Sequence, residues 1–175
     1  NDARNVLMKN GIKVVANNYA SSNVDMPTMP LDILSVFNND NSVVVFDVGG
    51  DDDGALALGQ YKQYFDKYGY EMHFIVNTKR PLTRTNDELI EIAERIESAS
   101  RLKFTDIYNN TNLSDQTDET TLFSGYDEIK MLSKKMGIVI KKNCGIDKAL
   151  SNVPTNLKDT VFRMNICILR PWEIQ

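Results

Sequence analysis

The sequence predicts an α/β fold, a three-layer sandwich built around a mostly parallel sheet. Short apolar runs alternate with amphipathic segments of helical length, which is the pattern of repeated β–α units. The clearest run, Val43 to Phe46, has four β-favouring apolar residues in succession and indicates a strand buried on both faces. The clearest helix follows Thr85, where apolar residues recur at helical spacing. Because no linker or internal repeat interrupts the 175 residues, we expect a single domain over residues 1–175.

Caps and turn residues place the elements in order. Asp2 is a candidate N-cap for the first helix, Thr85 and Glu88 form a capping box, and Gly69 and Gly137 mark helix ends. The predicted helices cover residues 2–9, 31–37, from the acidic run 51–53 to 68, from 85 to 99, and 119–136. The predicted strands cover residues 12–16, 42–47, 72–76, 104–108, 138–140 and 161–169, the last at an edge of the sheet. A long loop is expected at residues 17–30.

Composition excludes some classes of function. The formal net charge of −4 argues against a protein whose main task is to grip nucleic acid, because phosphate binding depends on clustered Lys and Arg. No apolar run approaches the roughly 20 residues that span a membrane, and the first residues lack a signal-peptide pattern. Cys144 and Cys167 lie far apart without metal-ligand spacing. We therefore interpret them as reduced thiols and expect a cytoplasmic protein.

The residues after each strand are the candidates for a binding site, because ligands bind at the carboxyl ends of parallel strands. Asp47 ends the predicted strand 42–47 and is followed by Gly49 and Gly50. This is a Walker B arrangement, in which the carboxylate holds Mg²⁺ and the glycines let the backbone approach a γ-phosphate. The alternative is an aspartate that caps the next helix, with glycines that make the turn.

Asparagine-rich segments follow the next two predicted strands. An Asn side chain has both a donor and an acceptor and can read the edge of a nucleobase, although Asn is also a common turn residue. The two segments, with their candidate ligand-binding residues, are Asn77, Thr78, Lys79, Arg80 and Pro81, and then Asn109, Asn110, Thr111 and Asn112.

Other polar residues have simpler interpretations. The acidic run 51–53 is better explained as charge at a helix N-terminus than as a metal site, because three adjacent carboxylates cannot all face one ion. His73 lies inside a predicted strand, and packing is favoured over catalysis. The sequence shows no Ser-His-Asp set, Cys-His pair or HExxH motif, so catalysis by a side-chain nucleophile is unsupported.

Residues 43–54, 74–84 and 104–113 together resemble the MinD/ParA-like (deviant-Walker, SIMIBI-type) branch of P-loop ATPases. They are most similar to a bacterial group of ATP-binding proteins whose strands end in DVGGDD, VNTxRPxTR and NNTNL. The ending Arg170-Pro171-Trp172 is also similar. The resemblance implies a P-loop NTPase-like fold, hydrolysis of ATP with Mg²⁺, and a role as a switch that acts on a protein client. It also implies that two subunits can form a homodimer around nucleotide.

Position by position, the resemblance implies that Asp47 is the Mg²⁺-side carboxylate and that Gly49 and Gly50 are switch glycines. It implies that Asn109 contacts adenine, while Asn110 stands where many relatives have Arg. Residues 77–81 would line the same mouth, and the loop 17–30 would lie near the phosphates.

The Walker A motif G-x-x-x-x-G-K-[ST], which cradles the phosphates, does not occur in the sequence. In the family it precedes the segment where this chain starts, so we expect a fragment, incomplete at the N-terminus, that does not itself hydrolyse ATP. A non-catalytic scaffold that binds a partner remains the main alternative. A receiver-like or flavodoxin-like domain, with Lys141 facing a phosphoacceptor Asp, is a third.

Overall fold

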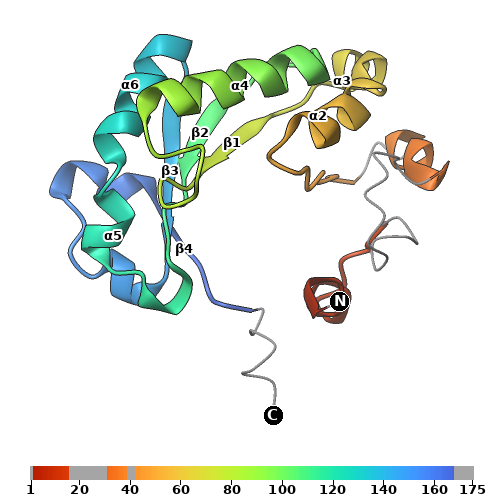
Figure 1. Ribbon diagram of the computed structural model, residues 1–175. Coiled ribbons are helices and arrows are strands. Elements are labelled where there is room, and N and C mark those ends of the chain that lie inside the picture. The colour runs from red at the N-terminus through yellow and green to blue at the C-terminus, as the bar shows by residue number, and fades with distance from the viewer. Residues whose placement is uncertain (1, 16–30, 39–41, 168–175) are drawn as a thin grey trace. The chain divides into compact units, whose positions relative to one another are not determined.

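The computed structural model describes residues 2–15, 31–38 and 42–167 (Figure 1). Its contacts group the chain into two units, each of which is described by itself. The first unit comprises Asn1–Tyr70, Ala99–Arg101 and Cys167–Gln175, and the second comprises Glu71–Ser98 and Leu102–Ile166. The prediction of one domain over residues 1–175 stays a prediction.

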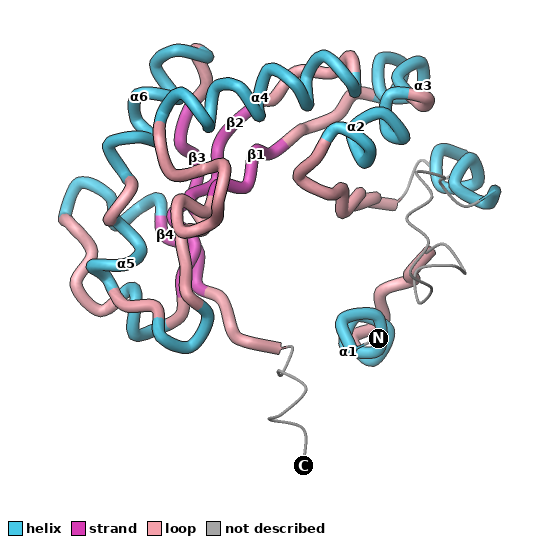
Figure 2. Tube along the Cα trace, in the orientation of Figure 1, coloured by secondary structure: helices cyan, strands magenta, loops and turns pink. Residues whose placement is uncertain are grey.

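The second unit contains a four-stranded, all-parallel sheet, which confirms the α/β class and the parallel topology (Figure 2). The strands lie in the order β1-β2-β3-β4, so β4 is at an edge as predicted. One extra residue interrupts the register between β2 and β3, because Ile107 pairs with Ile140 whereas Tyr108 pairs with Lys142. The bounds are β1 His73–Val76, β2 Asp106–Asn109, β3 Val139–Gly145 and β4 Val161–Arg163.

Helices connect the strands, as parallel pairing requires. The longest, α4, runs from Asn86 to Ser100 between β1 and β2, and its end falls in the first unit. Two helices, α5 and α6, follow β2, with one short 3₁₀ helix before α5 and two more between β3 and β4. Their bounds are α5 Glu119–Phe123, α6 Tyr126–Met136, η2 Ser114–Gln116, η3 Asp147–Leu150 and η4 Thr155–Thr160.

Alternate residues of β1 define the two faces of the sheet. Phe74 and Val76 are buried, whereas His73 and Ile75 are exposed. The strands lie side by side in the same order as along the chain. Because connections between parallel strands are almost always right-handed, the helices that connect these strands are expected on one face of the sheet. The core of this unit forms between that face and the helices, and includes Phe74, Val76, Leu89, Ala93, Phe104, Ile107, Ile129 and Leu132.

The first unit is helical, and aromatic packing holds it together. Phe37 stacks on Tyr64 with ring centroids 4.9 Å apart and meets Phe65 edge-on at 5.5 Å. Phe46 also packs edge-on against Phe65, at 5.2 Å. These contacts join three separate stretches of chain. The helices are α1 Asp2–Lys9, η1 Leu31–Asn38, α2 Asp52–Gly59 and α3 Lys62–Tyr68.

The prediction of a buried strand at residues 42–47 is wrong for this structure. The segment forms no strand, and Val43 and Val45 are 94% and 85% exposed. An apolar run favours a strand only where a neighbour supplies ladder hydrogen bonds, and no described residue does so here. Residues 12–15 likewise form no strand, whereas residue 16 lies outside the described residues.

Two predicted helices are each divided in two. The first breaks after Gly59, where a Cβ atom would lie 2.8 Å from the carbonyl oxygen of Ala99, so the backbones approach too closely for a side chain. The Gly59 carbonyl accepts a hydrogen bond from the guanidinium of Arg101. The second breaks at Gly125, which begins α6. In both cases the tertiary contact at a glycine overrides helical periodicity.

The remaining predicted helices are present to within about a residue at each end, whereas β3 continues to Gly145, five residues past the predicted end at 140. Within the described ranges, no helix has the length and apolar character needed to cross a membrane. The last predicted strand, 161–169, is confirmed only over its first three residues as β4; residues 164–167 form no strand, and residues 168 and 169 lie outside the described residues.

Candidate functional site at the carboxyl edge of the sheet

Two of the segments singled out by sequence start side by side. In the parallel ladder Val76 is the register partner of Asn109, so β1 and β2 end together. The backbone N–H of Asn110 donates to the carbonyl of Val76 at 2.8 Å and continues the pairing past the strand ends. The loops that follow both strands therefore lie at one edge of the sheet, as predicted.

Asn77 ties these two loops together. Its Oδ1 atom accepts from the backbone N–H of Lys79 at 2.9 Å and from that of Asn112 at 3.2 Å. Its Nδ2 atom donates to the carbonyl of Asn112 at 3.2 Å. Thr83 Oγ1 donates to the backbone carbonyl of Asn77 at 2.7 Å and folds the first loop back on itself. The Asn77 side chain thus shapes the edge, and its polar atoms have protein partners.

A tight contact lies beneath the loops. The hydroxyl groups of Thr78 and Thr111 are 3.2 Å apart, and the backbone N–H of Thr78 donates to Thr111 Oγ1 at 3.2 Å. A Cβ atom built on Gly125 would lie 2.2 Å from Thr78 Oγ1. Only glycine therefore fits at the start of α6, and the contact joins that helix to the first loop.

Asn109 is fully buried, and three hydrogen bonds use its amide group. Nδ2 donates to the carbonyl of Leu122 at 3.1 Å and to Asn143 Oδ1 at 3.0 Å. Oδ1 accepts from the backbone N–H of Thr111 at 3.1 Å. The contact with adenine expected for Asn109 stays a prediction, but both of its amide atoms already have partners inside the protein.

Asn110, the next residue, differs from Asn109. Its Oδ1 atom is buried and has no hydrogen-bond partner among the described residues. An unpaired buried carbonyl-type oxygen costs about 1–3 kcal/mol, so native proteins usually supply a partner, an ordered water or a ligand. Asn110 Oδ1 is thus an unpaired acceptor below the surface of the carboxyl edge, and a donor from outside reaches it only when the atoms that cover it move.

A shallow hollow of about 360 Å³ opens at the same edge. Lys79 and Arg84 supply two positive charges to its wall, while Glu128 accepts from the backbone N–H of Asn86 at 2.9 Å. The lining residues are Thr78, Lys79, Arg84, Ser124, Gly125 and Glu128. Arg80 and Pro81 are exposed on the same loop but do not line the hollow.

The predicted Walker B residues belong to the first unit. Asp47, Gly49 and Gly50 are exposed in an irregular segment before α2. Asp51 is the N-cap of this helix, and its Oδ1 atom accepts from the backbone N–H of Gly54 at 2.9 Å. The interpretation of the acidic run as helix N-terminal charge is therefore confirmed for Asp51. The Mg²⁺ role of Asp47 stays a prediction.

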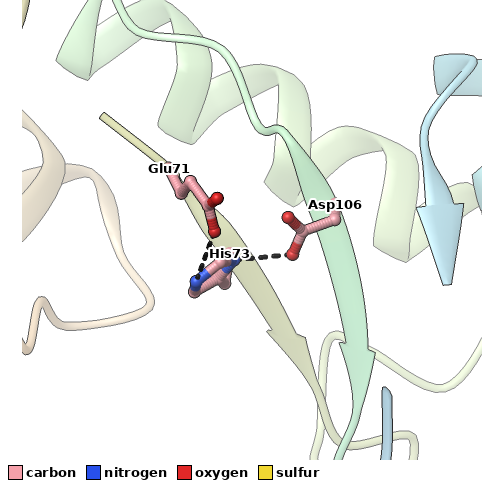
Figure 3. A group of neighbouring side chains, drawn as sticks. All are labelled: Glu71, His73 and Asp106. Carbon is pink, nitrogen blue, oxygen red and sulfur yellow. Dashed lines mark hydrogen bonds and ion pairs between the residues drawn. The ribbon is translucent and has the colours of Figure 1, made fainter. Parts of the chain in front are cut away.

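Sequence reasoning missed a polar cluster at the opposite ends of the strands (Figure 3). His73 Nδ1 lies 2.6 Å from Asp106 Oδ1, and Nε2 lies 3.7 Å from Glu71 Oε2. Lys141 donates to Glu71 Oε2 at 2.7 Å and to Asp106 Oδ2 at 3.3 Å. Because Lys141 lies here and not at a strand's carboxyl end, it does not suit the receiver-like alternative. The i, i+2 spacing of Glu71 and His73, which places both on one face, was the available signal.

Comparison of this chain with protein-family models, with curated proteins and with solved structures gave no match.

Proposed function

We propose that this chain is the nucleotide-binding part of an ATP-hydrolysing switch protein of P-loop NTPase-like fold, with nucleotide bound at the carboxyl edge of the sheet. The observation that supports the proposal best is the buried, unpaired Oδ1 atom of Asn110. The amino group of adenine is a donor that would satisfy it. The parallel sheet agrees with this location, because its loops converge where such folds bind ligands.

The charges near the edge suit phosphate groups. Lys79 and Arg84 in the wall of the hollow attract anions, and their two positive charges exceed the one negative charge that Glu128 adds to the same wall. Arg80 and Pro81, on the same loop, would border the ligand. The residues therefore fit a base acceptor and a phosphate counter-charge.

The same residues do not supply a complete hydrolytic site. The sequence lacks the G-x-x-x-x-G-K-[ST] loop whose amides and lysine surround the β- and γ-phosphates. Bound Mg²⁺ would neutralise phosphate charge, and Asp47 is the residue proposed to hold it. We expect this chain to bind nucleotide weakly and not to turn it over.

The test is a calorimetric titration of the chain with ATP and with GTP. We expect ATP to bind more tightly, because GTP has a carbonyl oxygen where adenine has its amino group and would face Asn110 Oδ1 with a second acceptor. Asn110→Ala should abolish this preference, whereas Lys79→Ala should weaken both nucleotides equally. Equal binding of ATP and GTP by the unaltered chain, or no binding of either up to about 1 mM, would refute the assignment.

The Mg²⁺ part of the proposal has a separate test. If Asp47 holds the ion, Mg²⁺ should raise the affinity of the unaltered chain for ATP and should have a smaller effect on Asp47→Ala. Asp53→Ala is a matched control, because it removes an exposed carboxylate of the same acidic stretch. An identical Mg²⁺ effect in Asp47→Ala would exclude Asp47 as the metal ligand.

The alternative of a non-catalytic scaffold has one specific observation in its favour. Ile75 and Val139 are 53% and 66% exposed on the sheet face opposite the buried Phe74 and Val76. Exposed apolar strands are typical of surfaces that bind other proteins. This reading predicts that Ile75→Lys impairs partner binding and that ATP gives no heat of binding.

A further inference from the structure

We infer that His73 and Glu71 form a binding site for a divalent transition-metal ion of the Zn²⁺ type, which Asp106 positions and Lys141 occupies as a competing cation. This site lies at the amino ends of β1 and β2, away from the carboxyl edge, and does not depend on the proposed nucleotide function. Figure 3 shows the imidazole of His73 between the two carboxylates.

Asp106 determines which ring nitrogen of His73 can bind a metal. Asp106 has a side chain that is 5% exposed, and its Oδ1 atom lies 2.6 Å from His73 Nδ1. An ionised carboxylate can only accept, so Nδ1 carries the proton and donates it to this hydrogen bond. In the neutral form of the ring, which is the form that binds a metal, the lone pair is then on Nε2. A carboxylate that holds a histidine in this way orients the ring and raises its basicity as a metal ligand.

The Glu71 carboxylate lies beside Nε2 of His73. Glu71 Oε2 lies 3.7 Å from Nε2, so a carboxylate oxygen and the second ring nitrogen are close enough to bind one ion together. In a tetrahedral Zn²⁺ site with bonds of about 2.0–2.2 Å, neighbouring ligand atoms lie roughly 3.3–3.6 Å apart. A small side-chain movement would give this spacing. One imidazole and one carboxylate suit Zn²⁺ and neighbouring transition ions better than Ca²⁺ or Mg²⁺, which prefer oxygen ligands.

Lys141 places a positive charge beside both carboxylates. It is the extra residue at the irregular pairing of β2 and β3, and such bulges re-aim side chains. Its ammonium group contacts Glu71 at 2.7 Å and Asp106 at 3.3 Å. Lys141 thus supplies positive charge where the ion would bind, and a metal must displace it from Glu71.

The experiment is a Zn²⁺ titration of the chain followed by calorimetry and by the NMR signals of the imidazole. His73 is the single histidine in the sequence, so a preparation without a histidine tag gives one set of ring signals. All variants carry Cys167→Ser, because this exposed thiol could also bind Zn²⁺. We expect saturable binding that shifts the signals of His73. No heat and no shift up to about 1 mM Zn²⁺ would overturn the proposal.

Variants separate the roles of the residues. His73→Gln should abolish binding, and Asp106→Asn should weaken it about 10–100-fold, because the amide oxygen still accepts from Nδ1 but lacks the charge. Lys141→Met should tighten binding roughly tenfold by removing a competing charge. Unchanged binding in His73→Gln would overturn the site.

A matched control guards against a general effect of charge. Lys103 pairs with Glu97 at 2.5 Å on the surface, with no histidine in the pair. Lys103→Met makes the same chemical change as Lys141→Met and should leave Zn²⁺ affinity unaltered. Equal effects of the two substitutions would show that Lys141 does not compete for the ion. Amide NMR spectra of each variant report whether the fold is retained.

Discussion

Replacing Asn109 by alanine tests whether this residue serves the fold or a ligand. The substitution removes hydrogen bonds to Leu122, Asn143 and Thr111, all formed at 3.0–3.1 Å around a fully buried side chain. Each contributes about 1 kcal/mol net, and the partners left behind are buried and unpaired. We expect the free energy of unfolding to fall by about 3–4 kcal/mol. At about 4 °C per kcal/mol, the melting temperature falls by about 12–16 °C.

The assay is thermal unfolding followed by circular dichroism, with urea unfolding as an independent measurement. Asn110→Ala is the matched control, since the two residues are adjacent and Asn110 Oδ1 has no partner to lose. It should leave stability unchanged or raise it by up to about 1–3 kcal/mol, because it removes an unpaired buried oxygen. If Asn109→Ala melts like the unaltered chain and loses ATP affinity instead, Asn109 contacts the ligand and the reasoning from its buried hydrogen bonds is refuted.

Three further predictions concern packing, thiol reactivity and pH. Gly125→Ala should lower the free energy of unfolding by about 1–3 kcal/mol in urea, because its Cβ would clash with Thr78. Gly50→Ala is the control, because a Cβ there meets open space, and an equal cost of the two substitutions would contradict the clash at Gly125. Burial raises the pKa of the Cys144 thiol to about 11. At pH 8 a maleimide should therefore label exposed Cys167 and leave Cys144 unlabelled until denaturant is added. Rapid labelling of both thiols without denaturant would show that Cys144 is accessible. Backbone hydrogen bonding lowers the pKa of Asp118 below 3.8, so its stabilisation is present above that pH and is lost as pH falls through the lowered value. Melting temperatures of Asp118→Asn should therefore fall less steeply with acid, and a slope equal to that of the unaltered chain would exclude this contribution.

The parts of the fold that the sequence predicts correctly are those with local signals. The helix that became α4 has a capping box, and the structure shows Glu88 accepting from the backbone N–H of Thr85 at 3.0 Å. The strands β1 and β2 are short, apolar and bounded by polar residues, which explains why their positions were found to within two residues. Periodicity and caps are properties of a single segment and need no partner to be recognised.

The errors come from interactions between distant segments. The run Val43–Phe46 has the composition of a buried strand, but composition cannot state which neighbour pairs with it. Gly59 interrupts a helix because the backbone near Ala99 approaches it, 40 residues along the chain. Gly125 does so because Thr78 lies against it. A single sequence without homologues contains no signal for such pairings.

The candidate site was predicted at the level of segments and not of atoms. Polar loops after parallel strands placed Asn77 and Asn109 at one edge, as the structure confirms. Sequence reasoning could not tell Asn109, whose amide is satisfied, from Asn110, whose oxygen is not, because the difference depends on partners such as Asn143. The residue expected to contact a base is therefore less available than its neighbour.

The polar cluster lies on the face of the sheet that the order of the strands leaves without connecting helices. All four strands follow one another in order, so the crossovers leave the second face without connecting helices. On that face His73 is the register partner of Asp106, and the irregularity in β3 brings Lys141 to both carboxylates. An apolar layer laid over this end would bury Glu71 and Lys141 beside the already buried Asp106, at a cost of several kcal/mol per ion if any pairing were imperfect. A partner that contacts this face should therefore be polar beside Glu71 and Lys141, and apolar where it meets the exposed side chains of Val139 and Ile75.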